Sequence, residues 1–130
     1  MTLFIDASAI IAILAGEDGW RTIERELTTH VVIWSAMSAW EANAGMCRSY
    51  RLQPQEARER IEALSREMGF RLVSIGEREA ELALDAYARY GKNRHSAALN
   101  MGDCFAYACA KANDARLLYK GNDFAQTDLA

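Results

Sequence analysis

Four acidic side chains lie in apolar or small-residue surroundings, each at the edge of a predicted helix or strand: Asp6, Glu41, Asp103 and Asp123. Carboxylates that converge on one place repel one another, which raises their pKa values. A divalent cation removes that conflict, and ligation by oxygen alone favours Mg²⁺ or Mn²⁺ over zinc. A water molecule bound to such an ion suits the hydrolysis of a phosphodiester bond. The four acids therefore indicate a metal-dependent phosphoryl hydrolase.

Several of these acids also have a purely structural explanation. Asp103 falls in the first turn of a predicted helix, where the helix dipole favours a negative charge. Ser38 and Glu41 have the spacing of a capping box, and Asn122–Asp123 is ordinary turn chemistry. The chain holds 18 Asp and Glu residues in all, so the hypothesis depends on where the fold places these four.

Apolar periodicity predicts strands that alternate with pairs of helices. The predicted strands cover residues 2–5, 31–34, 71–75 and 115–119. The predicted helices cover residues 8–16, 17–29, from Ser35 or Ser38 to 50, 54–68, 77–90 and 103–113. This order is typical of an α/β fold with a mainly parallel central sheet of four to five strands and helices on both faces. We expect one domain over residues 1–130, with a helical hairpin at about 36–68.

The same order brings the four acids toward one edge of the sheet. Asp6 directly follows the first predicted strand, and Asp123 follows the last one. Glu41 and Asp103 lie early in helices that connect strands. Sites of open α/β sheets form beyond the carboxyl ends of the strands, so we expect the four carboxylates to meet there.

Composition limits the class of protein. A chain of 130 residues with 51% hydrophobic residues and one proline should fold around a real core. The net charge of −3 argues against broad, non-specific nucleic-acid binding, but allows a local basic surface. No run has the length of a transmembrane helix, and no Lys or Arg precedes the apolar residues 9–15 as in a signal peptide. Three cysteines without a CxxC pair predict neither disulfides nor zinc, and we expect a cytoplasmic protein.

The chain resembles the PIN-domain ribonucleases of the VapC type, which are the toxins of bacterial toxin–antitoxin pairs. The resemblance extends over the whole chain and is carried by the segments Phe4–Ala9, Ser38–Glu41, Leu99–Ala108 and Tyr119–Phe124. It implies a Mg²⁺-dependent endoribonuclease (with Mn²⁺ as the other possible ion) that leaves a 5′-phosphate. It also implies a homodimer and inhibition by a cognate antitoxin protein. The acidic site that it implies consists of Asp6, Glu41, Asp103 and Asp123, with Asp6 and Asp103 first among the metal ligands.

Basic residues near the predicted site are candidates for contacts with RNA phosphates. Lys92 and Arg94 precede the helix of Asp103, and Arg48 and Arg51 end the helix of Glu41. A solvated basic face explains them equally well. Two other functions stay open: a non-catalytic PIN-like module that binds a partner, and a Mg²⁺-dependent nuclease that acts on DNA.

Two further predictions have competing explanations. Ser8 either forms a hydrogen bond near Asp6 or caps the following helix. Trp40, Tyr50 and Met68 fit an interface between subunits as well as they fit the core.

Overall fold

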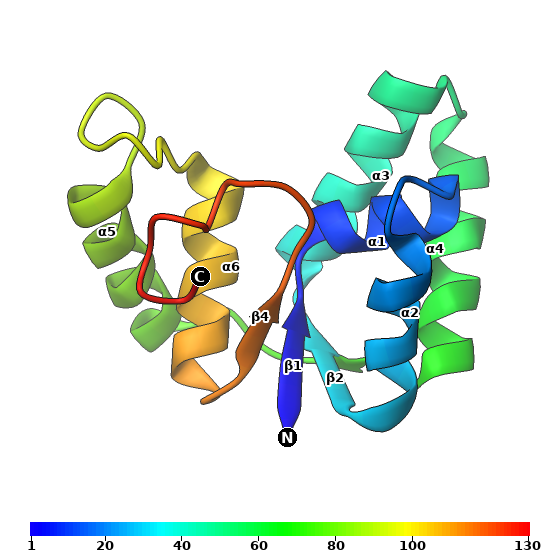
Figure 1. Cartoon of the computed structure of the whole chain (residues 1–130), viewed down its shortest axis with the longest axis horizontal. Coiled ribbons are helices and arrows are strands. Elements are labelled where there is room, and N and C mark those ends of the chain that lie inside the picture. The colour runs from blue at the N-terminus through cyan, green and yellow to red at the C-terminus, as the bar shows by residue number, and fades with distance from the viewer.

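A parallel four-stranded sheet lies between two groups of helices in a computed structural model that describes residues 1–130 (Figure 1). The strands are β1 (Thr2–Ile5), β2 (Val31–Trp34), β3 (Arg71–Leu72) and β4 (Arg116–Leu118). The helices are α1 (Ala7–Ala15), α2 (Trp20–Thr29), α3 (Ala36–Tyr50), α4 (Pro54–Met68), α5 (Glu77–Tyr90) and α6 (Met101–Ala112). The strand order is β3-β2-β1-β4, and every neighbouring pair is parallel. The predicted α/β class and the alternation of one strand with two helices are confirmed.

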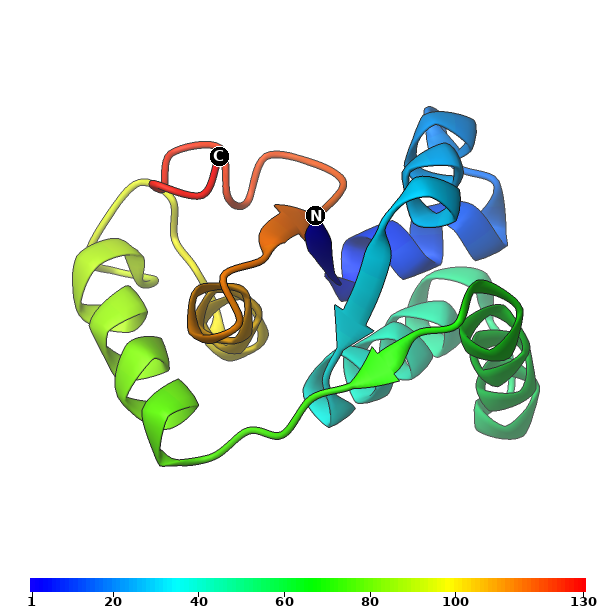
Figure 2. The ribbon, with the colours of Figure 1, turned by 90° about the horizontal axis from the view of Figure 1, so that it is seen from below.

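Alternating side chains of β1 divide the core into two clusters, because successive residues of a strand point to opposite faces. Leu3 and Ile5 pack with the first four helices, whereas Phe4 packs with α5, α6 and the C-terminal segment. Figures 1 and 2 show α5 and α6 on one side of the sheet and α1 to α4 on the other. The sheet is therefore covered on both faces, as parallel sheets require.

The third strand is shorter than predicted. The sequence predicts a strand over residues 71–75, but β3 contains only Arg71 and Leu72. The N–H of Val73 still donates to the carbonyl of Trp34 at 2.8 Å. Trp34 is the last residue of β2, so the chain beyond Val73 has no strand to pair with.

Helix starts differ from the predicted ones because capping residues decide them. The α1 helix begins one residue before Ser8, since the Asp6 carboxylate caps it. The α2 helix begins only at Trp20, after Gly19 adopts a left-handed conformation with φ of 84°. The α6 helix begins at Met101, because Asn100 supplies the cap.

The predicted helical hairpin is confirmed as α3 and α4. Arg51 turns the chain between the two helices with φ of 57°, and Pro54 begins α4. The side-chain amide of Asn43 donates to the Pro54 carbonyl at 3.0 Å and ties the hairpin together. All three cysteines are free thiols. None of the helices has both the length and the apolar composition needed to cross a bilayer.

Replacing Phe4 by Ala should lower the free energy of unfolding by about 3–5 kcal/mol, because its ring is fully buried against α6. Urea denaturation measures this change. Leu84→Ala is the control, since Leu84 is 68% exposed and its loss should change the free energy by no more than about 0.5 kcal/mol. Equal effects of the two substitutions would contradict the described core.

Candidate active site

Asp6 lies at the carboxyl end of β1 and is nearly buried, with 5% of its surface exposed. Its Oδ2 accepts hydrogen bonds from the backbone N–H of Ser8 at 3.0 Å and from the Ser8 hydroxyl at 2.6 Å. The Ser8 hydroxyl oxygen accepts in turn from the N–H of Lys120, just beyond β4, at 2.9 Å. Ser8 therefore connects the ends of two neighbouring strands and orients Asp6, while Asp6 itself is the helix cap.

Asp103 lies in the first turn of α6, in a reciprocal arrangement with Asn100. Its backbone N–H donates to Oδ1 of Asn100 at 2.9 Å, and its Oδ2 accepts from the Asn100 N–H at 3.1 Å. The helix-start explanation of Asp103 is thus correct. A functional role is still compatible with this cap, because only Oδ2 of Asp103 takes part in it and Oδ1 stays available to a ligand.

Glu41 does not form the capping box predicted with Ser38. The cap of α3 is Ser35, whose hydroxyl accepts from the Ser38 N–H at 3.2 Å, and Glu41 lies beyond the first turn. Its carboxylate instead packs against the Cα of Gly102, where a Cβ of any larger residue would overlap it. Gly102 directly precedes Asp103, so the contact brings Glu41 to the start of α6.

Asp123 is exposed and lies in the segment that follows β4. Phe124, the next residue, is fully buried in the α5–α6 cluster and fixes this segment to the core. On the other side, the hydrogen bond from Lys120 to Ser8 holds the segment beside Asp6.

The charges of the four carboxylates act on one another. Burial raises the pKa of Asp103 to about 7, with smaller contributions from the charges of Asp123, Asp6 and Glu41 and an opposing one from the Asn100 N–H. Burial also raises the pKa of Asp6, against the hydrogen bonds from Ser8, and the charge of Asp123 raises it further. The pKa of Glu41 is raised by burial and by the charge of Asp6. All four predicted acids therefore lie in one electrostatic neighbourhood.

This set of ligands fits a hard divalent cation, because every donor is a carboxylate oxygen and the acids' mutual repulsion calls for a positive charge. As placed, no three Asp, Glu, His or Cys side chains are close enough together to hold a metal ion. The charges of the acids thus act on one another over distances longer than a metal–ligand bond, and like charges without a counterion hold flexible carboxylates apart.

The basic residues predicted to meet RNA fall into two groups. Burial and the charge of Asp6 raise the pKa of Glu41, and the charge of Arg48, on the same helix, opposes this rise, so Arg48 acts on the acidic site. The other three are exposed, and their charges do not contribute to the raised pKa values of Asp6, Glu41 and Asp103: Arg51, Lys92 and Arg94.

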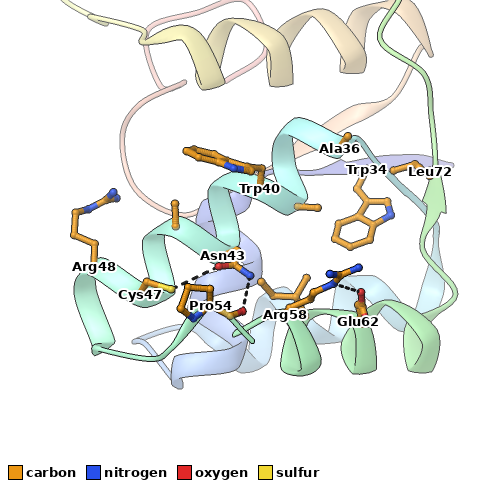
Figure 3. Close-up of a pocket in the computed structure, with 13 residues that line it drawn as sticks. Trp34, Ala36, Trp40, Asn43, Cys47, Arg48, Pro54, Arg58, Glu62 and Leu72 are labelled. Atoms are coloured by element: carbon orange, nitrogen blue, oxygen red, sulfur yellow. Dashed lines mark hydrogen bonds and ion pairs between the residues drawn. The ribbon is translucent and has the colours of Figure 1, made fainter. Parts of the chain in front are cut away.

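A groove of about 940 Å³ runs along α3 and the start of α4 and reaches Arg48 (Figure 3). Its walls carry Trp40, which is 70% exposed, and Leu72 of β3, which is 67% exposed. Of the residues predicted for an interface or the core, Tyr50 is also exposed, whereas Met68 packs against the core. The groove is thus a largely apolar surface, and Arg48, whose charge acts on Glu41, connects it to the acidic site.

Comparison with known proteins decides the family. The PIN domain family model matches residues 3–129. A VapC ribonuclease of Rhizobium meliloti (strain 1021) is 40% identical, and the match covers 97% of this chain and 98% of the relative. The chain belongs to the PIN-domain family, among the VapC ribonucleases. The resemblance inferred from the sequence is confirmed.

Other relatives agree with this assignment. Ribonuclease VapC of Mycolicibacterium smegmatis is 36% identical, with 98% of each chain covered. The crystal structure of VapC20 of Mycobacterium tuberculosis, described as a sarcin–ricin loop cleaving toxin, shares the fold with a TM-score of 0.73 at 20% identity, covering 95% of this chain and 92% of that one. A structure described as VapBC2 from Rickettsia felis bound to a promoter DNA fragment matches with a TM-score of 0.70 at 10% identity, covering 99% and 95%. The PIN fold predicted for this chain is therefore shown.

Three residues that build this PIN-domain site were missed by sequence reasoning: Asn100, Gly102 and the backbone of Lys120. The spacing of Asn100 and Asp103 is that of a capping box and was a usable signal. The contact of Gly102 with Glu41 has no sequence signal, because it depends on how closely α3 and α6 approach each other.

The metal-free protein should lose stability as the pH rises from about 4 to 7. The pKa of Asp103 is raised from 3.8 to about 7, so over this range the folded state binds more protons than the unfolded state. Asp103→Asn should flatten this dependence and raise the free energy of unfolding at pH 7.5 by at least about 1 kcal/mol. Urea denaturation in EDTA at pH 5 and 7.5 measures it, with the exposed Asp114→Asn as control. An unchanged pH dependence in Asp103→Asn would contradict the described environment of this carboxyl.

Proposed function

We propose that this chain is a metal-dependent endoribonuclease and the toxin of a bacterial toxin–antitoxin pair. The observation that carries the proposal is the mutual influence of four acidic charges, which raises the pKa values of Asp6, Glu41 and Asp103, in a chain of the VapC ribonuclease family. The reaction is hydrolysis of an RNA phosphodiester bond by a metal-activated water. No observation favours the alternatives of a non-catalytic partner-binding module or a nuclease acting on DNA.

The chain's own residues would hold and orient the ion, Mg²⁺ or Mn²⁺. Asp6 and Asp103 are its proposed principal ligands, joined by the two other carboxylates, Glu41 and Asp123. When bound, the ion supplies a water of lowered pKa and neutralises charge that develops on the phosphate. Ser8 and Asn100 fix the directions of the two principal carboxylates through the hydrogen bonds described above.

The proposed substrate is single-stranded RNA in a loop of a structured molecule, the usual target of sequence-selective RNA recognition. Arg48 is the best supported phosphate contact, because it lies beside Glu41. We also propose phosphate contacts for three other basic residues, although no observation links them to the acids: Arg51, Lys92 and Arg94. A contact with phosphate weakens as salt increases, so the salt dependence of cleavage by Arg48→Gln tests this assignment.

The function is tested with the purified, partner-free protein, total RNA, and Mg²⁺, Mn²⁺ or EDTA, with single-stranded and duplex DNA in parallel. We expect discrete RNA cleavage that needs the metal and falls at least about 100-fold in Asp6→Asn and Asp103→Asn. Cleavage of DNA alone would support the DNA nuclease, and no cleavage by a folded, metal-loaded protein would support the binding module. Cleavage that survives both substitutions would remove the acidic site from the reaction.

Gly102→Ala is a matched test of the geometry in the same assay. The added methyl group should push the flexible Glu41 carboxylate away, while helix α6 gains the better propensity of Ala. Activity should therefore fall without loss of stability, and the loss should not add to that of Glu41→Gln. Full activity of Gly102→Ala would contradict the described position of Glu41.

We further propose that the antitoxin covers the groove along α3 and α4, and that the toxin forms a homodimer. The groove combines an exposed apolar surface around Trp40 with the cation Arg48, whose charge acts on Glu41 of the acidic site. Large exposed apolar patches mark sites of protein contact. An antitoxin segment with apolar side chains and a carboxylate for Arg48 complements it.

Trp40→Glu should weaken binding of the cognate antitoxin by at least about 30-fold, the effect of losing an aromatic hot spot. Calorimetric titration of the toxin with that antitoxin measures the change. Leu84→Glu on α5 is the matched control, because Leu84 is as exposed as Trp40 but lies outside the groove. Equal affinities of both variants and the wild type would rule out this docking surface.

A further inference from the structure

One face of α6 carries three residues in register. Asp103, Tyr107 and Lys111 follow one another at intervals of four positions, so they line one side of the helix. Asp103 belongs to the acidic site, whereas the functional proposal uses neither Tyr107 nor Lys111. Both of these residues instead contact the C-terminal segment.

The segment after β4, residues 119–130, here called the C-terminal strap, lies beside α6 (Figure 1). The Oδ1 of Asp128 accepts a hydrogen bond from the Tyr107 hydroxyl at 2.7 Å, and its Oδ2 accepts from Nζ of Lys111 at 2.5 Å. Earlier in the strap, Asp123 acts on the charge of Asp103. The strap therefore contacts α6 through Asp128 at Tyr107 and Lys111, and it carries Asp123, whose charge raises the pKa of Asp103 in the first turn of the same helix.

A second layer of hydrogen bonds supports the Asp128 contact. Arg89 of α5 donates to the Tyr107 hydroxyl at 3.3 Å and to the Tyr90 hydroxyl at 2.8 Å, and Tyr90 reaches Asp128 at 3.4 Å. Burial acts to raise the pKa of Asp128, but the hydrogen bonds from Lys111 and Tyr107 outweigh it and lower the pKa to about 2. The carboxylate is thus held in its charged form throughout the physiological pH range.

Asp123 itself has no such network. The two residues before it, Gly121 and Asn122, are exposed, and Gly121 adopts a left-handed conformation with φ of 98°. The strap is fixed on either side of this stretch: before it by Lys120, which donates to Ser8, and after it by the buried Phe124, by the hydrogen bond between Ser96 and Gln126, and by Asp128. The position of Asp123 is therefore set by the contacts of the residues before and after it in the strap.

We propose that Asp128 is a positioning residue that holds the strap on α6 and thereby places Asp123 in the acidic site. The inference rests on the proposed function, since it gives Asp123 its role as a metal ligand. Asp128 touches neither the substrate nor the ion. Asp128→Ala should destabilise the protein without unfolding it: the ion pair with Lys111 is partly exposed, at 36% of each side chain, and adds little stability, whereas the hydroxyl of the buried Tyr107 loses an acceptor.

A double-mutant cycle tests the proposal: wild type, Asp128→Ala, Asp123→Asn and the double variant, each titrated with Mn²⁺ by calorimetry and assayed for RNA cleavage. Asp128→Ala should bind Mn²⁺ roughly tenfold more weakly, the usual effect of losing an outer support of a metal site, and Asp123→Asn, which removes a proposed ligand, should bind at least as weakly. The double variant should bind no more weakly than Asp123→Asn, because Asp128 acts through Asp123. Asp128→Asn keeps the acceptor for Tyr107 and should lose less than Asp128→Ala.

Hydrogen exchange supplies a readout that needs neither metal nor RNA. The amides of Lys120 and Thr127 should exchange faster in Asp128→Ala, while Asp114→Asn, a matched loss of one exposed carboxylate after α6, should change neither exchange nor affinity. Wild-type affinity in Asp128→Ala, or losses that add in the double variant, would overturn the positioning role while leaving the nuclease in place. Wild-type protein that neither binds Mn²⁺ nor cleaves RNA would overturn the proposed function and this inference together.

Discussion

Repulsion between buried carboxylates is the constraint on which the rest of this structure depends. Asp103 and Asp6 are almost withdrawn from water, and each lies within the field of other acids. Burial and like charge both favour the protonated form, which is why the pKa of Asp103 reaches about 7. A fold that keeps such groups together loses stability unless something neutralises them. The proposed divalent cation would do so and would gain binding energy from relieving the same repulsion.

Contacts at the strand ends and at the start of α6 hold the repelling carboxylates near one another. Ser8 joins Asp6 to the chain beyond β4, and Asn100 fixes Asp103 at the start of α6. Gly102 admits the Glu41 carboxylate between α3 and α6. Each of these contacts links an acid to a neighbouring helix or strand end. These elements also pack into the two core clusters, so a change in the packing of either cluster should shift the positions of the acids.

Much of this arrangement follows from the sequence, because it is local. The order of strands and helices could be predicted from apolar periodicity, and the placement of Asp6 and Asp123 from their position after strands. Contacts between distant segments could not. The capping box of Ser38 with Glu41 was wrong, because Ser35 offers an earlier cap and Glu41 is drawn to Gly102 of another helix. The end of β3 at Leu72 depends on where β2 stops, and the contacts of Asp128 depend on the path of the strap along α6.

The most direct measurement is the pKa of the Asp103 carboxyl, followed by NMR through its side-chain ¹³C resonance with EDTA and with saturating Mg²⁺. If four carboxylates share one cation site, Asp103 titrates near 7 without metal, and its pKa falls by several units when Mg²⁺ is present. The same titration in Asp6→Asn should start from a lower pKa, because one of the repelling charges is gone. A pKa near the ordinary value of 3.8 that is the same with and without Mg²⁺ would contradict both the shared environment and the role of the ion.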